Sequence, residues 1–293
     1  VEYRKVKPGA LFGSLRDIAE GLAPEDQVVI EGIQKLREGV IGKVLFSRCY
    51  YNGARPSIKK GQPGQPPATL NWELWQGPAP DRPYMSNGEG KTTDVYVHYN
   101  WHWRWHWGGG ELANNGIHSL DVARWGLGVD YPTQVSFLGG RYHFDDDQET
   151  PDTGTAVFQF GDKGCSWEVS SCHPRREEKH SMVIFYGTEG TLHIIDPGYK
   201  IFNLKGEETA KGTGAGGEQQ HIDNFLECIR TGKSPNSEIE EGQKSTLLCH
   251  LGNISYKLGR MIKFDPVSRK VVGDKDAEAL WGREYRKGWE PII

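Results

Sequence analysis

The sequence predicts an α+β fold whose core is a predominantly antiparallel β-sheet. Between residues 134 and 204, short runs of alternating apolar and polar residues are separated by tight turn signals such as GDKG, GTEG and DPG. Strands joined by such short turns must pair antiparallel, because a parallel crossover needs about a dozen or more residues. Segments with helical spacing follow these runs, so helices are expected beside the antiparallel sheet.

Residues 1–27 are expected to form an atypical N-terminal segment. It has a basic start, VEYRKVKPG, and then a short helical pattern from Leu15 to Leu22 that Ser14 would cap. This is too little for a domain, and the rest of the chain is long enough for one large domain or two modest ones. Its first element is predicted to be a helix from Asp26 to Glu38, because apolar residues recur there at helical spacing.

The remaining elements are expected in the following order. KVLFSRCYY is typical of a strand, and residues 52–90, rich in Pro and Gly, indicate a functional or interface loop. The next predicted strands are Gln134–Phe144, Thr155–Phe160, Cys165–Ser171, Met182–Tyr186, Thr191–Ile195 and Tyr199–Leu204. The predicted C-terminal helices are Glu218–Arg230, Glu240–Arg260 and Asp276–Tyr285.

The stretch from His98 to Leu127 concentrates Trp, His, Gly and Asn more densely than any other part of the chain. Its first half alternates with the period of two residues expected of an extended strand. One face of that strand would carry Trp101, Trp103, Trp105 and Trp107. The other would carry His102, Arg104 and His106. Three glycines, 108–110, would end the strand, and a helix would begin at Glu111.

A polar trio on that helix suggests a site. Asn114 and His118 are four residues apart and Asp121 is three further on, so all three project from one helix face. His118 is the best single candidate for proton transfer, because an imidazole titrates near neutral pH and Asp121 or Asn114 could orient it. The candidate substrate-binding residues are Asn100, His102, Arg104, His106 and Trp107.

Composition excludes several kinds of partner. A net charge of −4, from 35 basic and 39 acidic residues mixed along the chain, gives no long-range field for nucleic acid or anionic lipid. No apolar run reaches the length of a membrane span. The five cysteines are scattered and show no C-x-x-C pair, so a reducing compartment such as the cytoplasm fits best.

Two further motifs are weaker. Gly212, Gly214 and Gly217 satisfy G-x-G-x-x-G, but no buried strand leads directly into the first glycine, so we expect a loop and not a dinucleotide site. Asp145, Asp147 and Glu149 alternate like the start of a calcium loop, but the glycine and glutamate that such a loop needs later are absent, which favours a solvated acidic turn. His102 and His106 keep a metal possible, and none is predicted.

The run GGGELANNGIHSLDVARWGLG resembles the G-G-x-x-x-D-x-G-x-H-x-x-D motif of the glucose-fructose oxidoreductase / inositol dehydrogenase / MocA (Gfo/Idh/MocA) family. Further matches are IQKLREGVIGKV, LWQGPAP, HYNWHWRWHW, ETPDT, HIDNFLECIRTGK and EEGQKSTLLCHLGNISYKLGR. Together they cover residues 28–293 almost continuously and resemble the C-terminal domain of the bacterial members.

The resemblance implies an open antiparallel sheet with helices packed on one face, and a homo-oligomer formed through that sheet. Family members bind NAD(P) in an N-terminal Rossmann domain and oxidise a sugar or cyclitol alcohol with a Lys of an E-K-P motif and an Asp and a His. Here the position of the Asp is Asn114 and that of the His is His118, while Lys7 is a candidate remnant of the E-K-P lysine.

We therefore expect the substrate-binding domain of an NAD(P)-dependent oxidoreductase that acts on a sugar or cyclitol. We expect no Rossmann domain in this sequence, so the chain alone should bind no dinucleotide and be redox-inactive. Two alternatives stay open. One is a cofactor-independent lyase or hydrolase acting on glycosides or keto-sugars with His118 as acid/base, and the other is a non-catalytic carbohydrate-binding or scaffold module.

Overall fold

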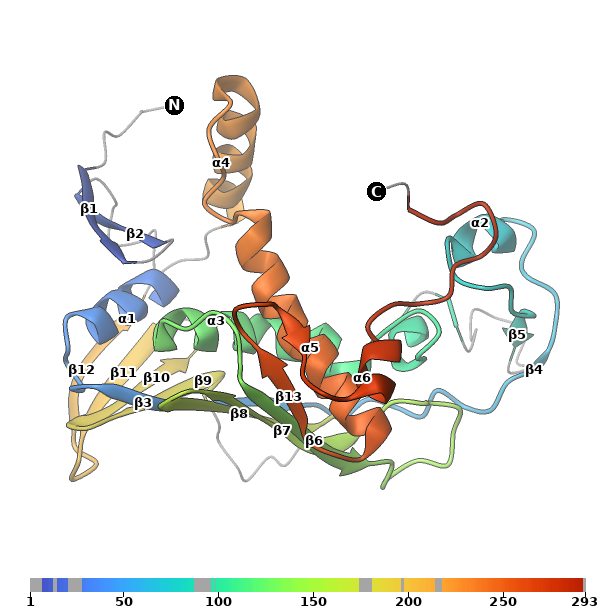
Figure 1. The fold of residues 1–293 in the computed structure, drawn as a ribbon, viewed down its shortest axis with the longest axis horizontal. Coiled ribbons are helices and arrows are strands. Elements are labelled where there is room, and N and C mark those ends of the chain that lie inside the picture. Colours follow the sequence, from blue (N-terminus) through green and yellow to red (C-terminus); the bar gives the residue numbers. More distant parts are fainter. Residues whose placement is uncertain are drawn as a thin grey trace. The chain divides into compact units, whose positions relative to one another are not determined.

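The computed structural model describes residues 7–12, 15–20, 28–86, 96–97, 99–173, 181–195, 198–213 and 218–291. The chain divides into two compact units, each made from two separate segments. The first unit is Val1–Leu45 with Ser181–Gly242, and the second is Phe46–His180 with Gln243–Ile293. Most strands pair antiparallel and helices pack against them, so the α+β prediction is confirmed (Figure 1).

Four strands form the sheet of the first unit, in the order β12-β11-β10-β9, and all pair antiparallel. The first unit contains β1 (Lys7–Phe12), β2 (Leu15–Glu20), α1 (Val28–Arg37), β9 (Val183–Gly187), β10 (Gly190–Ile195), β11 (Gly198–Asn203), β12 (Glu208–Thr213) and α4 (Glu218–Thr231). Helix α1 lies on this sheet because Ile33 and Leu36, one turn apart, are both buried.

The second unit has strands in the order β3-β8-β7-β6-β13-β14. All of these neighbours are antiparallel except β3 and β8, which run parallel. The strands are β3 (Val44–Asn52), β6 (Gln134–Gly140), β7 (Thr153–Phe160), β8 (Lys163–Ser170), β13 (Ile262–Asp265) and β14 (Lys270–Val271), with a separate hairpin of β4 (Gln62–Pro63) and β5 (Met85–Ser86). The helices are α2 (Trp72–Gln76), α3 (Ile117–Leu127), α5 (Ile239–Leu258) and α6 (Lys275–Ala279).

The core of the second unit follows from residue alternation. Strand β7 buries every second residue, and on β8 the side chains of Cys165, Trp167 and Val169 are buried. Helices α3 and α5 lie on the same face of these strands (Figure 1). Two contacts hold them there: α3 packs on β8, and the Ser255 hydroxyl of α5 accepts the backbone N–H of Phe137 on β6 at 3.0 Å.

Two predicted elements are wrong. Within the segment expected as a helix from Leu15 to Leu22, residues 15–20 form strand β2, which pairs antiparallel with β1. A helix this short gains little from propensity alone, so strand pairing outweighs it. The segment expected as a Trp strand is a 3₁₀ helix at Asn100–Trp103 followed by turns up to Trp107, so its aromatic side chains do not share one face.

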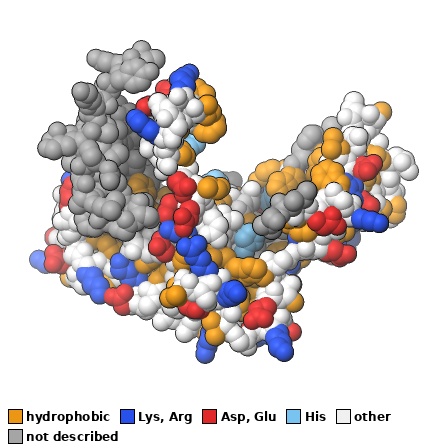
Figure 2. All heavy atoms as spheres, turned by 45° about the horizontal axis from the view of Figure 1, so that its top comes forward, with side chains coloured by type: hydrophobic (Ala, Val, Ile, Leu, Met, Phe, Trp, Pro, Cys, Tyr) orange, Lys and Arg blue, Asp and Glu red, His pale blue; other side chains and the backbone are white. Residues whose placement is uncertain are grey.

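Charged side chains of both signs are interspersed over the face drawn in Figure 2. Among the residues that the structure describes, no helix is both long and apolar enough to cross a membrane. The cysteines within the described ranges are free thiols, and the Sγ atoms of Cys49 and Cys165 lie 3.9 Å apart.

Candidate functional site

Residues 100–107, called the Trp segment below, are joined by the glycine turn at 108–110 to the helical segment that follows. A Cβ at Gly108 would lie 2.5 Å from the Cα of His102, and one at Gly109 would lie 2.7 Å from the Cβ of Ala113. Gly110 has a φ of +65°, and its Cβ would lie 2.6 Å from that of Thr150. Only glycine fits positions this crowded, which accounts for three in a row.

Residues 145–152 belong to the loop of the β6–β7 hairpin and are called the acidic hairpin below. They also hold the Trp segment in place. The Glu149 carboxylate accepts the backbone N–H of Trp105 at 2.8 Å, and the backbone N–H of Glu149 donates to the carbonyl of Trp103 at 3.0 Å. Arg82 lies 3.2 Å from the same carboxylate. Backbone and charge thus fix the path of residues 103–105.

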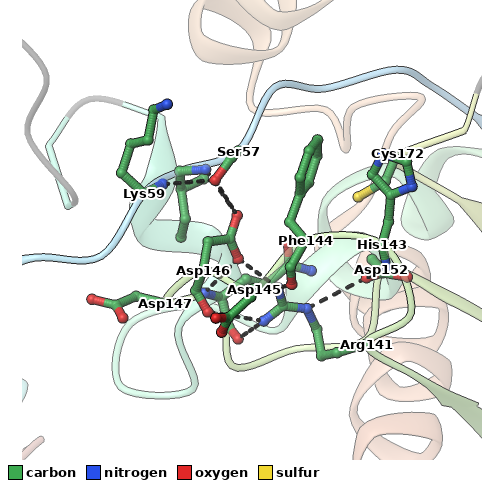
Figure 3. Close-up of polar contacts among 12 residues, drawn as sticks. Ser57, Lys59, Arg141, His143, Phe144, Asp145, Asp146, Asp147, Asp152 and Cys172 are labelled. Atoms are coloured by element: carbon green, nitrogen blue, oxygen red, sulfur yellow. Dashed lines mark hydrogen bonds and ion pairs between the residues drawn. The ribbon is translucent and has the colours of Figure 1, made fainter.

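Asp146 anchors this hairpin from inside the protein. Its fully buried carboxylate lies 2.5 Å from Arg141 and 3.4 Å from Arg55, and it accepts the backbone N–H of Ile58 at 2.9 Å. Figure 3 shows Arg141 reaching both Asp146 and Asp152. Burial alone would raise the pKa of Asp146, but the donated hydrogen bonds and the two guanidinium groups bring its pKa below the ordinary value.

The prediction of a solvated acidic turn is therefore wrong for most of this hairpin. Asp145 is exposed, whereas Asp147 lies 3.6 Å from the buried Arg104 and Glu149 pairs with Arg82. The arginines come from segments far away in the sequence and neutralise acids that looked free in it. Within the described residues, no group of three His, Cys, Asp or Glu side chains is arranged to hold a metal ion.

A cleft of about 730 Å³ opens beside the glycine turn, entirely within the second unit. One wall consists of residues 105–109 and Ala113, another is a face of α5, and the third is the C-terminal segment 280–285. The aromatic, polar and charged side chains in its lining include Trp105, His106, Trp107, Asn253, Lys257 and Arg283. Aromatic walls with a few polar groups are typical of ligand sites.

Trp107 connects this cleft to an aromatic cluster. Its ring lies at centroid distances of 4.8 Å from Tyr96, 5.2 Å from Trp75 and 5.9 Å from Trp72. The stacked rings of Trp72 and Trp75 come from α2, in the Pro- and Gly-rich region predicted as a functional loop. That region therefore supports the cleft wall.

His118 and Asn114 follow the glycine turn in the chain, close to the cleft-lining residue Ala113 in sequence. Residues Leu112–Gly116 form a π-helical turn before α3, a feature that is frequent at functional sites. The His118 side chain is exposed, Asn114 is half-buried, and neither makes a hydrogen bond to a described residue. Both are thus available to a ligand.

Asp121 has partners of its own. The Ser245 hydroxyl of α5 donates to its carboxylate at 2.5 Å, and Arg124 lies 3.9 Å away. Asp121 therefore contacts α5, and among the described residues it forms no hydrogen bond or ion pair with His118.

The other predicted substrate-binding residues differ in their exposure. His106 and Trp107 line the cleft, and Asn100 is half-buried in the 3₁₀ helix. His102 and Arg104 are buried: His102 binds the carbonyl of Tyr99 through Nδ1, and Arg104 lies over the Tyr96 ring at 4.6 Å. These two side chains support the Trp segment from within the protein.

Residues on α5 and in the C-terminal segment were missed in the sequence. Asn253 and Lys257 are four apart on one helix face, which is a usable signal, although it equally fits an ordinary surface stripe. Glu111 was also missed: it is buried and accepts hydrogen bonds from the Trp103 indole at 3.1 Å and from Asn115, and burial raises its pKa. Arg283 lies outside any helix or strand, so no residue spacing in the sequence indicates where its side chain is placed.

The structural context of the glycine motif at residues 212–217 differs from that of a dinucleotide fingerprint. Gly212 and residue 213 belong to β12, and the other residues of the expected loop, 214–217, lie outside the described ranges. Strand β12 is exposed and antiparallel to β11, whereas the dinucleotide fingerprint needs a buried parallel strand before its glycines. Val6 is also outside the described ranges, and Lys7 begins β1.

Solved structures with this fold are oxidoreductases. An aldose-aldose oxidoreductase from Caulobacter crescentus is 18% identical with a TM-score of 0.56, and the match covers 80% of this chain and 60% of that one. The WlbA dehydrogenase from Bordetella pertussis is 16% identical with a TM-score of 0.53, covering 81% and 60%. A putative oxidoreductase from Erwinia carotovora atroseptica is 18% identical with a TM-score of 0.52, covering 80% and 61%.

The match thus spans about three fifths of the length of these proteins. No curated protein matches the sequence. The family model described as the oxidoreductase family, C-terminal alpha/beta domain, matches residues 50–291, which is well over half of the chain. The chain has the antiparallel sheet and the Gly-Gly-x-x-x-Asn-x-Gly-x-His motif expected of this domain. It therefore belongs to the Gfo/Idh/MocA oxidoreductase family, of which it matches the C-terminal domain.

Proposed function

We propose that this chain is the substrate-binding part of an NAD(P)-dependent oxidoreductase that acts on a sugar or cyclitol. The observation that carries the proposal is the glycine turn, which lines an aromatic cleft and leads directly into the helical segment of Asn114 and His118. Aromatic faces beside hydrogen-bonding groups suit sugar rings. Among the similar structures, one contains glycerol and another contains NADH and UDP-GlcNAcA, which supports the proposal.

His118 is the proposed proton-transferring group. Its imidazole is exposed and makes no hydrogen bond to a described residue, so it can receive a proton from a substrate hydroxyl. Asn114 can hold that hydroxyl through its amide, but an amide cannot accept the proton near neutral pH. Asp121 is then a positioning residue, because its carboxylate is engaged by Ser245.

NAD(P) would be held by other parts of the enzyme. The described residues offer no parallel strand, glycine turn and helix in the arrangement that a dinucleotide needs, so we assign the cofactor no residue here. We also propose that copies of the chain associate through the sheet, as in the resembling family.

Calorimetric titration of the purified chain tests this function. We expect millimolar to micromolar binding of at least one sugar or cyclitol, and no NADH binding at micromolar concentration. His118→Ala should weaken sugar binding by about tenfold, the factor for one lost hydrogen bond. His143→Ala is the matched control, because it removes an exposed imidazole away from the cleft. Micromolar NADH binding, or equal effects of the two variants, would contradict the proposal.

A further inference from the structure

We infer that the cleft selects an anionic sugar, that is, a hydroxylated ring bearing a carboxylate or phosphate. This inference rests on the proposed function and names the substrate class of the same site. Three features carry it: two cations without acidic partners, a buried amide oxygen without a donor, and aromatic rings that can stack on a sugar.

The cations are Lys257 on α5 and Arg283 in the C-terminal segment. The Nζ atom of Lys257 lies 4.5 Å from the centre of the Trp105 ring. Within the described part of the chain, Arg283 donates only to backbone carbonyls, those of His106 at 3.2 Å and Glu284 at 3.4 Å. Among the described residues, neither side chain forms an ion pair. The arginines around the acidic hairpin, by contrast, all have carboxylate partners, so these two cations are free to bind an external anion.

Asn253 supplies the neutral part of the recognition. Its side chain is only 7% exposed, and its Nδ2 donates to the carbonyl of Gly109 at 2.8 Å. Because a carbonyl can only accept, this contact fixes the amide with its oxygen turned the other way. That Oδ1 is buried and has no donor in the described protein. A buried acceptor is costly when unpaired, and a sugar hydroxyl can supply the missing donor.

The aromatic walls and the size of the cleft fit a sugar. Trp105, Trp107 and Trp281 line it, and its volume of about 730 Å³ is within the range of small-molecule pockets. Indole faces stack on the apolar face of a sugar ring while the hydroxyls reach polar groups at its edge. The ring would thus lie between the indoles, with Asn253 and the cations at its rim.

The other titratable groups that face the cleft leave it positive. Glu284 is the acidic residue in the lining, and His106 and His250 also line it. Burial lowers the pKa of both histidines, so they are neutral near pH 7. Burial also lowers the pKa of Lys257, because its ammonium group has lost part of its hydration. The negative charge of Glu149 acts in the opposite direction but has the smaller effect on this pKa. An anionic group on the substrate would compensate that loss.

Calorimetry on the full chain tests the inference with four probes: D-glucuronate, D-glucose 6-phosphate, D-glucose and inorganic phosphate. We expect one of the two anionic sugars to bind at least about tenfold more tightly than glucose, as for one charge-assisted hydrogen bond. Lys257→Met and Arg283→Gln should each remove most of that preference, so that each variant binds the anionic sugar about as tightly as it binds glucose. Lys263→Met, which removes an exposed lysine of β13 outside the cleft, is the control and should change nothing.

Each other outcome has a distinct meaning. If glucose binds as tightly as both anionic sugars, and Lys257→Met alters neither, the anionic preference is overturned while sugar binding stands. If inorganic phosphate competes as well as the sugars, the site is a simple anion site and the inference is overturned. If no sugar binds, the inference and the proposed function fail together. Asn253→Leu adds a check, because it should weaken all the sugars equally and leave phosphate unaffected.

Discussion

Gly110 shows how one residue can determine the geometry of this site. Its φ of +65° disfavours any side chain, and a Cβ would also lie 2.6 Å from the Cβ of Thr150. Gly110→Ala should therefore destabilise the second unit by about 3 kcal/mol, from backbone strain and steric overlap together. Urea unfolding followed by Trp fluorescence measures this loss.

Gly161→Ala separates these two contributions. Gly161 has the same φ of +65°, but nothing lies within 4 Å of its would-be Cβ. This variant should lose only the strain, about 1 kcal/mol. Equal losses of unfolding free energy in Gly110→Ala and Gly161→Ala would show that Thr150 can move away from the added methyl group without destabilising the fold.

Asp121 offers a second test at the scale of one residue. Its carboxylate accepts the Ser245 hydroxyl and lies 3.9 Å from Arg124, and its side chain is more than half exposed. Asp121→Asn keeps an acceptor for Ser245, so it should cost less than about 1 kcal/mol. Sugar affinity should stay within about twofold of the wild-type value. A tenfold loss of sugar affinity would instead place Asp121 beside the substrate.

The acidic hairpin is the element whose stability depends most on charge. Because hydrogen bonds and two arginines bring the pKa of Asp146 below its ordinary value, the ionised form stabilises the fold. This contribution is complete above the unfolded pKa, near 3.8, and is lost as the pH falls through the lower folded value. Asp146→Asn should cost about 3 kcal/mol at pH 7 and progressively less below pH 3.8.

The matched control is Asp145→Asn. Asp145 pairs with Lys60 at 2.6 Å, but its side chain is 91% exposed, so its loss should be small at every pH. The measurement is the free energy of unfolding of each variant between pH 2 and pH 8. A cost of Asp146→Asn that stays constant across this range would refute the pKa argument.

Comparing elements shows what the sequence could predict. The strands β6 to β11 and the helices α1, α4 and α5 were expected within a few residues, because alternation and turn residues are local signals. The Trp segment gave a false strand signal: its period of two arises from indoles that pack in different directions. Trp103 is buried against Arg55, whereas Trp105 lines the cleft. Only tertiary contacts distinguish the two arrangements.

The site itself was less predictable for the same reason. His118 and Asn114 were found through a motif with fixed spacing, but the cleft depends on segments about 150 residues apart, such as Gly109 and Asn253. The hairpin acids looked solvated because Arg55 lies about 90 residues before Asp146. Contacts at such separations leave no periodic trace in the sequence.

At the scale of the whole molecule, each unit buries its own apolar cluster. The first unit buries Phe185, Leu192 and Ile33, and the second buries Trp167 and Phe158. A chain with two such clusters need not unfold in one step. All ten Trp residues belong to the second unit, so Trp fluorescence reports on that unit alone, whereas far-UV circular dichroism reports on both.

This distribution of Trp makes the two units separable in one experiment. We expect urea unfolding followed by circular dichroism to show a phase that fluorescence does not detect. Asp146→Asn should lower the fluorescence midpoint by about 1 to 2 M urea, because its cost falls on the second unit. The phase seen only by circular dichroism should not move. If the two probes give superimposable curves in the wild type and in Asp146→Asn, the units unfold as one cooperative structure, and Gly110→Ala must then destabilise the entire chain and not the second unit alone.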